Sequence, residues 1–318
     1  MRNSPMPNSV IGYIWRVSGR HQIALAALSV VVFLLSTVPL ELQRRIVNDA
    51  IARGATATIV WLALAYIAFA LTEGGLKLVL NVYRGWVSET AVRDLRHGMG
   101  ALTARAAMAE DRAMAEGVEI SMILSEAEPI GGFVGSSVSE PLLQGGVLLS
   151  VFGYLAWLEP LMALLSLAVF SPQLAFVPLM QRAMNERAAE RIRTLREVSG
   201  EIVGASGGDA VLAAAQDGRI GHVFRLNMGI YKLKFSMNFL MNLMHHLGVA
   251  TALGVGGWYA AQGRIEVGTV VAFVSGLAKV NDPWGDIVNW FREMTVVGMR
   301  YQLVADAMRW LSQEEVPA

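Results

Sequence analysis

Long stretches without a charged residue are the feature that most constrains how this chain folds. A helix that crosses the hydrocarbon core of a bilayer needs about 20 predominantly apolar residues in a row. Five stretches close to or above this length contain no Asp, Glu, Lys or Arg, and a sixth, shorter one precedes Lys279. The sequence therefore predicts an all-α membrane protein with six transmembrane helices. The predicted spans are Gln22–Leu40, Gly54–Thr72, Pro141–Leu158, Pro160–Gln181, Phe235–Gln262 and the shorter Val267–Leu277.

The composition agrees with a membrane protein and argues against other classes. Hydrophobic residues make up 54% of the 318 residues and charged residues only 16%, whereas soluble domains contain about 25% charged residues. The lack of cysteine excludes disulfides and thiolate metal sites, and the net charge of zero argues against a nucleic-acid partner. The first span is too long for a signal peptide and no small-residue cleavage site follows it, so we expect it to be retained.

Basic residues are distributed unequally between the two ends of the predicted spans. Twenty Lys and Arg residues lie in the segments at one end, and only Arg44, Arg45, Arg53 and Arg264 lie at the other. Because basic residues favour the cytoplasmic side, we predict cytoplasmic termini and a bacterial inner-membrane location. The predicted organisation is a disordered N-terminus at 1–9, a six-helix transmembrane domain at 10–312 and a C-terminal tail at 313–318.

The two connections on the predicted cytoplasmic side are long. Val82–Ala109 and Met180–Val203 mix charged residues with apolar ones at spacings of three and four, which is typical of a solvated helix. We therefore expect the membrane helices to continue into the cytoplasm and to turn at their far ends. The first turn is predicted at Met114, Ala115, Glu116 and Gly117, and the second within Gly204–Gly218.

The order and spacing of these segments resemble the transmembrane domain of ABC exporters, which has six spans, short outer turns and two long cytoplasmic hairpins. The local matches to motifs of that family are Glu116–Glu126, Glu201–Gly204, Gln262–Gly268 and Pro283. The chain departs from the family pattern at Glu126, where Asp is usual, and at Glu266, which replaces a hydroxyl residue. The spacing within Glu201–Gly204 is also one residue short. The resemblance covers about residues 10–312, nearly the whole chain.

This resemblance implies a permease subunit of an ATP-driven exporter, which is not an enzyme by itself. Separate ABC ATPase subunits would bind Mg-ATP, so no cofactor is expected on this chain. The subunit would form a homodimer, or a heterodimer with a homologous membrane subunit, around the path of an unidentified substrate that is moved by alternating access. The resemblance places the coupling to the ATPase at Met114, Ala115, Glu116, Gly117, Gly207, Gly208, Asp209, Val211 and Leu212.

The Ser-Gly-Gly sequence in the second turn raises the question of nucleotide binding on the chain itself. Ala205–Asp209 shares only its middle three residues with the Leu-Ser-Gly-Gly-Gln signature of ABC ATPases. The chain contains no Gly-Lys-Ser or Gly-Lys-Thr, which a phosphate-binding loop requires. We therefore interpret this segment as a turn that opens a short helix, Asp209–Gln216, and by resemblance as a coupling helix.

Polar residues of the last helix form a stripe, which comprises Lys279, Asp282, Asp286, Asn289 and Glu293. At about 100° per residue these positions fall within an arc of about 80°, and Trp290 lies at its border. Ionisable groups at membrane depth usually face the bundle interior or water, so the stripe is interpreted as one wall of a substrate path. The alternative, which is favoured for Glu293, is that the helix has already left the bilayer and that these residues make solvated or interhelical contacts.

Three other ionisable residues lie in or near the predicted spans. His245 and His246 of the fifth span are assigned to the substrate path, with a structural role as the alternative. Adjacent helical residues point about 100° apart, so the two histidines do not form one metal site. Lys77 is expected to pair with Glu73, four residues earlier in the sequence.

Two other functions remain open at this point. In an ion-coupled secondary transporter, Asp282 and Asp286 would be the coupling groups, although such carriers often contain broken helices or internal repeats and no repeat is evident in the sequence. A transport-inactive membrane scaffold or sensor would keep the exporter fold without ATPase motifs. An ATPase gene beside the gene for this chain would favour the permease.

Overall fold

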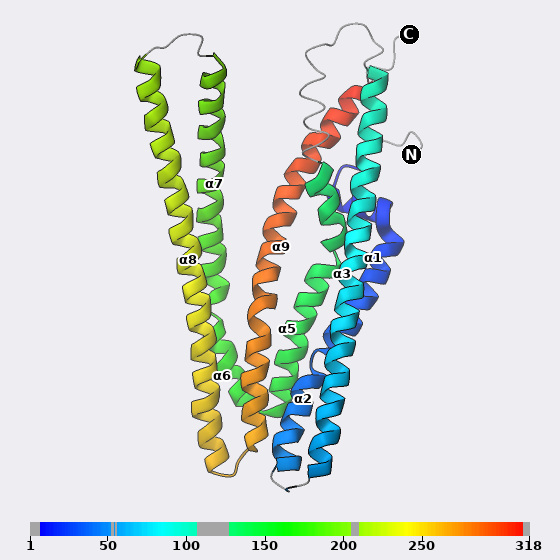
Figure 1. The fold of residues 1–318 in the computed structure, drawn as a ribbon, viewed down its shortest axis with the longest axis vertical. Coiled ribbons are helices and arrows are strands. Elements are labelled where there is room, and N and C mark those ends of the chain that lie inside the picture. The colour runs from blue at the N-terminus through cyan, green and yellow to red at the C-terminus, as the bar shows by residue number, and fades with distance from the viewer. Residues whose placement is uncertain (1–6, 52–53, 55, 107–126, 205–209, 314–318) are drawn as a thin grey trace. The chain divides into compact units, whose positions relative to one another are not determined.

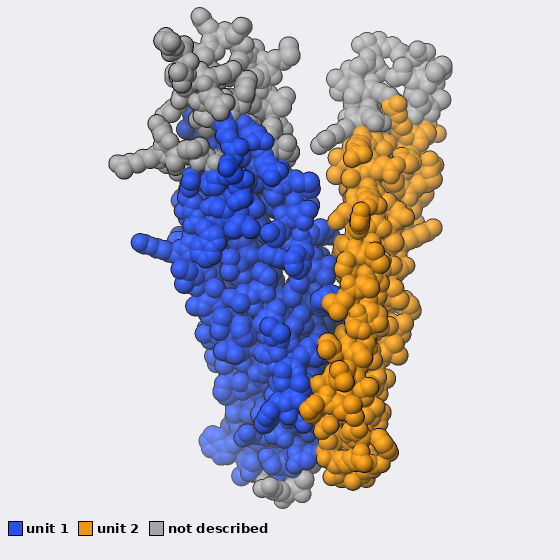
Figure 2. Space-filling model, turned by 180° about the vertical axis from the view of Figure 1, so that it is seen from behind, with its two compact units in different colours: residues 1–158, 266–318 blue, residues 159–265 orange. Residues whose placement is uncertain are grey.

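The computed structural model describes residues 7–51, 54, 56–106, 127–204 and 210–313, and within them it contains helices and turns but no strand (Figure 1). The chain divides into two compact units (Figure 2). Unit 1 comprises residues 1–158 and 266–318, and unit 2 comprises residues 159–265.

Five helical segments are long and apolar enough to cross a membrane, which supports a membrane protein. They are Val10–Asp49, Thr56–Ala101, Ala127–Leu158, Pro160–Leu195 and Asp217–Ala261. Each of the first five predicted spans overlaps one of these segments. The helix that contains Val267–Leu277 is not among them, because charged residues follow its apolar start, so the sixth crossing stays a prediction.

Unit 1 is built around the packing of α5 against α1 and α9, and α1 also packs against α3. Its elements are α1 (Val10–Leu35), α2 (Val38–Arg45), the π-helix η1 (Ile46–Ile51), α3 (Thr56–Ala106), α5 (Ser139–Leu158) and α9 (Val267–Gln313). The side chains of Leu25, Leu155 and Phe273, from α1, α5 and α9, are completely buried. At Gly146 of α5, the ring of Phe33 occupies the space that a side chain would fill, so the glycine permits close packing of α1 and α5.

The first predicted span is not one helix. α1 ends at Leu35, and Ser36 and Thr37 form a turn before α2. Pro39 lies in the first turn of α2, lacks a backbone N–H, and its ring excludes the carbonyl of the residue four positions earlier. The expectation of an unbroken helix over Gln22–Leu40 was therefore wrong, and the proline is the physical reason.

The chain before α1 is attached to the far end of α9. Ser9 accepts a hydrogen bond from the backbone N–H of Gly12 at 3.1 Å and so caps α1. The hydroxyl of Tyr301 donates to the carbonyl of Pro7 at 2.8 Å, and Arg309 donates to the side chain of Asn8 at 3.0 Å. Burial raises the pKa of Tyr301 to about 12.

Unit 2 comprises α6 (Pro160–Phe170), α7 (Gln173–Gly204) and α8 (Ala210–Ala261), and α8 packs against both α6 and α7. A turn at Ser171 and Pro172 divides the fourth predicted span into α6 and α7. As at Pro39, the proline lacks a backbone N–H and interrupts the helix.

The predicted helical continuations over Val82–Ala109 and Met180–Val203 are confirmed for the described residues, since α3 extends to Ala106 and α7 spans Gln173–Gly204. The prediction of a separate short helix at Asp209–Gln216 was wrong, because Ala210 to Gln216 are the first turns of α8. Gly218 costs a helix only about 1 kcal/mol relative to alanine, and with no proline following it the helix continues.

Candidate functional site

The polar stripe of α9 lies on unit 1, where the structure divides it into two edges. Lys279 and Asp286 are half-buried, and both contact side chains of other helices. Asp282, Asn289 and Glu293 are exposed. Lys279 and Asp286 are seven residues apart and so share one helix face, whereas the exposed residues lie on the other edge of the arc.

Lys279 lies at the break between α1 and α2. Its ammonium donates to the carbonyl of Ser36 at 2.7 Å, at the end of α1 where backbone carbonyls lack intrahelical partners. The same nitrogen is 3.6 Å from Glu73 Oε2, and Lys77 is 3.0 Å from Glu73 Oε1. The pairing of Lys77 with Glu73 confirms the prediction. Glu73 is buried. The cluster therefore places one buried carboxylate between two cations, Lys77 and Lys279.

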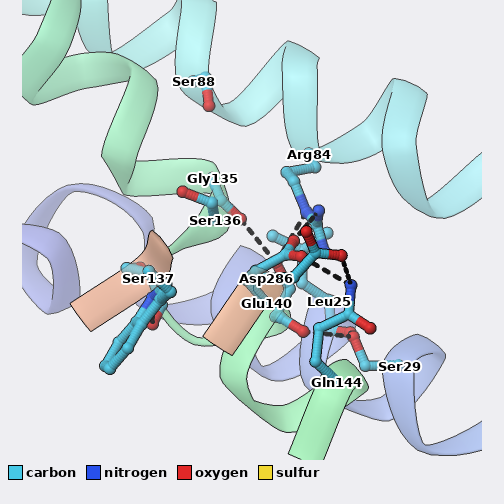
Figure 3. A network of polar contacts seen from close by, with 12 residues as sticks. Leu25, Ser29, Arg84, Ser88, Gly135, Ser136, Ser137, Glu140, Gln144 and Asp286 are labelled. Atoms are coloured by element: carbon cyan, nitrogen blue, oxygen red, sulfur yellow. Dashed lines mark hydrogen bonds and ion pairs between the residues drawn. The ribbon is translucent and has the colours of Figure 1, made fainter. Parts of the chain in front are cut away.

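A second polar network joins α3, α5 and α9, about two helical turns further along α9 than Lys279 (Figure 3). Arg84 of α3 forms an ion pair with Glu140 of α5 and donates from Nε to Ser139 Oγ at 2.9 Å. Gln144 Nε2 donates to Glu140 Oε1 at 2.8 Å and to Asp286 Oδ2 at 2.9 Å. This network combines one cation with two carboxylates, so its charge imbalance is opposite in sign to that of the Glu73 cluster.

Trp290, predicted at the border of the stripe, makes a structural contact. Its indole N–H donates to the carbonyl of Ser137 at 3.1 Å, in the turn that precedes α5. On the other side of this turn, Gln22 of α1 donates to the carbonyl of Val134 at 2.7 Å. These bonds fix the backbone that presents Glu140 and Gln144.

His245 and His246 lie in α8 and belong to unit 2. Their rings are in edge contact, with centroids 5.5 Å apart. Among the described residues no group of three His, Cys, Asp or Glu side chains is placed to hold a metal ion. The assignment of the two histidines to the substrate path stays a prediction.

Most predicted coupling residues lie outside the described part of the chain. These are Met114, Ala115, Glu116, Gly117, Gly207, Gly208 and Asp209. Val211 and Leu212 lie in the first turn of α8, and the description there covers only the backbone. The coupling to an ATPase therefore stays a prediction.

A third network, at the opposite end of unit 1 from Tyr301, was not predicted. Arg44 holds Glu41 through two hydrogen bonds of 2.8 and 2.9 Å and lies 3.3 Å from Glu266. Asn48 donates to Glu266 at 2.5 Å and accepts from the backbone N–H of Gly268 at 2.6 Å, which attaches η1 to the start of α9. The spacing of Glu41 and Arg44 on one helix face was the only sequence signal for this network.

Arg84, Glu140 and Gln144 were also missed as site residues. Glu140 and Gln144 share one face of α5 by their spacing of four, but only the packing of three helices shows that they meet Arg84 and Asp286. No family model matches the chain, and no curated protein matches its sequence.

Proposed function

We propose that the chain is the membrane-spanning permease subunit of an ATP-driven exporter. In this proposal separate ATPase subunits bind Mg-ATP and move the subunit through the two cytoplasmic turns. Two such membrane subunits, identical or homologous, enclose the path of the substrate.

The observation that carries the proposal is the length of the helices. At 1.5 Å per residue, the 51 residues of α3 and the 52 residues of α8 extend for about 75 to 80 Å, against a hydrocarbon core of about 30 Å. Reactions confined to the bilayer need no such extensions. A motor that lies away from the membrane needs rigid connections to the transport path, and continuous helices provide them.

The polar residues of α9 support a path through unit 1. Lys279 is 12 residues and Asp286 is 19 residues from the start of α9 at Val267, or about 18 and 28 Å along the helix. If α9 enters the membrane at its start, both residues lie within the thickness of the hydrocarbon core. Ionisable side chains at such depth are costly in free energy and mark substrate or ion pathways in membrane proteins. The exposed Asp282 and Asn289 would line the water-filled side of this path.

The experiment is affinity capture of the tagged full chain from membranes of its own host, followed by measurement of ATP hydrolysis. The wild-type complex is expected to hydrolyse ATP, and the chain purified alone is expected to show only background. Val211→Asp combined with Leu212→Asp is expected to abolish capture of the ATPase. The matched control, Ala213→Asp combined with Ala214→Asp, adds the same charge two positions along and is expected to retain the ATPase. A wild-type complex without hydrolysis above the empty-tag background contradicts the proposal.

A second candidate is an ion-coupled secondary transporter, and the divided first span favours it. Discontinuous helices are frequent in such carriers, where backbone carbonyls released at the break bind the coupling ion. Here the ammonium of Lys279 occupies that position on the carbonyl of Ser36. Uptake by proteoliposomes under a pH or sodium gradient without ATP distinguishes the two functions, since the exporter requires ATP.

A further inference from the structure

Three aromatic rings form a cluster on the surface of α1 and α3. His21 Nδ1 and the hydroxyl of Tyr83 are hydrogen-bonded at 2.7 Å. The ring of His21 meets that of Trp86 edge-on, with centroids 5.2 Å apart, and the rings of Tyr83 and Trp86 stack at 6.1 Å. Trp86 is 53% exposed although it is a large aromatic residue. The cluster therefore presents an aromatic surface with polar edges to the surroundings of unit 1.

The α1 side of this cluster is positively charged, whereas on α3 the exposed Glu89 follows Trp86 by three residues. Arg20, the neighbour of His21, is exposed and contacts no carboxylate among the described residues. The first acidic residue of the sequence is Glu41, so the 40 residues before it carry arginines and no counter-charge. Trp15, also on α1, is 50% exposed. Basic and aromatic side chains thus occur together on one helix, without acidic side chains between them.

The α1 part of the cluster lies where the chain is predicted to enter the bilayer, and its α3 part lies within the candidate span Thr56–Ala101. His21 directly precedes the first charge-free span, Gln22–Leu40. The backbone of α1 departs from helical geometry at Ser18, with φ −134° and ψ 17°, so the residues before and after it do not form one straight helix. Trp and Tyr concentrate at membrane–water interfaces, and Lys and Arg near the cytoplasmic leaflet interact with anionic lipids.

We propose that Arg20, His21, Tyr83 and Trp86 form a binding site for the headgroup of an anionic phospholipid. Arg20 pairs with the lipid phosphate, and His21 and Tyr83 supply the polar edge of the site. The exposed ring of Trp86 packs along the first carbons of the lipid. This proposal depends on the predicted membrane topology and is independent of the transported substrate and of any ATPase.

The test measures lipid binding to the purified full chain in neutral detergent by native mass spectrometry. The probes are phosphatidylglycerol and phosphatidylcholine with identical acyl chains. We expect tighter binding of the first phosphatidylglycerol than of the first phosphatidylcholine. Arg20→Gln is expected to lower the affinity for phosphatidylglycerol roughly fivefold, the effect of one basic residue near an anionic surface. Arg20→Lys keeps the charge and is expected to retain most of the affinity.

Arg93→Gln is the matched control. Arg93 lies on α3, seven residues after Trp86, and is 65% exposed, but it already pairs with Asp94 at 3.3 Å. Its replacement is expected to leave both affinities unchanged. Equal affinity for the two lipids, or equal losses from Arg20→Gln and Arg93→Gln, would overturn the site. Displacement of phosphatidylglycerol by millimolar inorganic phosphate would assign the residues to a free anion and would also overturn the proposal.

Discussion

The two units of the molecule hold their helices together in different ways. In unit 1 the interhelical pair of Arg84 and Glu140 is largely buried, with each side chain 17% exposed, and Glu73 is 11% exposed beside Lys279. In unit 2 the interhelical pair of His222 and Glu190 measures 2.9 Å, but its side chains are 39% and 54% exposed. These two polar contacts of unit 1 are largely shielded, whereas this contact of unit 2 competes with solvent.

The pair of His222 and Glu190 lies in the predicted cytoplasmic extensions, whereas the networks of unit 1 lie in or next to its predicted spans. Apolar surfaces gain little by leaving lipid for protein, so close packing and polar contacts determine which helices associate. Unit 1 has both, through Gly146 against Phe33 and through its two charged networks. Unit 1 is therefore expected to lose more stability when a single polar or packing contact is removed.

The largest effect is expected from Glu73→Gln. This change removes the carboxylate that faces both Lys77 and Lys279 and leaves two cations without this counter-charge, one of them half-buried. Breaking a buried ion pair typically costs about 3 to 5 kcal/mol, and we expect a loss near the lower value. Denaturant unfolding in detergent measures the change. Glu186→Gln in unit 2 removes an exposed pair with Arg182 and serves as the control, with an expected loss below about 1 kcal/mol. Equal losses would refute the comparison.

A smaller effect is expected from Gly146→Ala in α5. The added methyl group meets the ring of Phe33, and overpacking of this kind costs about 1 to 3 kcal/mol. Gly145→Ala and Gly254→Ala are the controls, because a side chain at either position meets open space. These two changes are expected to be neutral, or to stabilise by up to about 1 kcal/mol through helix propensity. If Gly146→Ala behaves like its controls, α1 and α5 are not packed as closely as described.

The smallest effect is expected from Glu190→Gln in unit 2. The change removes the charge that faces His222, at a site where both side chains are more than one-third exposed. Exposed pairs contribute about 0 to 1 kcal/mol, so the free energy of unfolding should change by less than about 1 kcal/mol. The same unfolding measurement in detergent checks this value. A loss as large as that of Glu73→Gln would show that unit 2 depends on its polar contacts as strongly as unit 1.

The spans and the long extensions were predictable because they depend on local sequence. A charge-free stretch or a spacing of three and four describes one helix by itself, and so does the pair of Glu73 and Lys77. The breaks after Leu35 and Phe170 also had a local signal in Pro39 and Pro172. The prediction of unbroken spans followed the apolar composition around these two prolines instead.

The partners of the polar stripe were not predictable from the sequence. Helical periodicity places Lys279 and Asp286 on one face of α9, but it says nothing of which helix lies against that face. The carbonyl of Ser36 is 243 residues from Lys279, and Gln144 is 142 residues from Asp286. Such contacts depend on the register between packed helices. The division of the stripe into a half-buried edge and an exposed edge follows from the same packing.

The exposed edge of α9 also gives the most direct test of the proposed path. Because the chain has no cysteine, Asp282→Cys and Asp286→Cys each introduce a single thiol, and reaction with a membrane-impermeant thiol reagent is measured in native membranes. Cysteine at 282 is expected to react, and cysteine at 286 to react more slowly, because Asp282 is exposed and Asp286 is half-buried. Phe273→Cys, at a completely buried position of the same helix, is expected to stay unmodified. Protection of both 282 and 286 in every conformational state tested would contradict a water-filled path along α9.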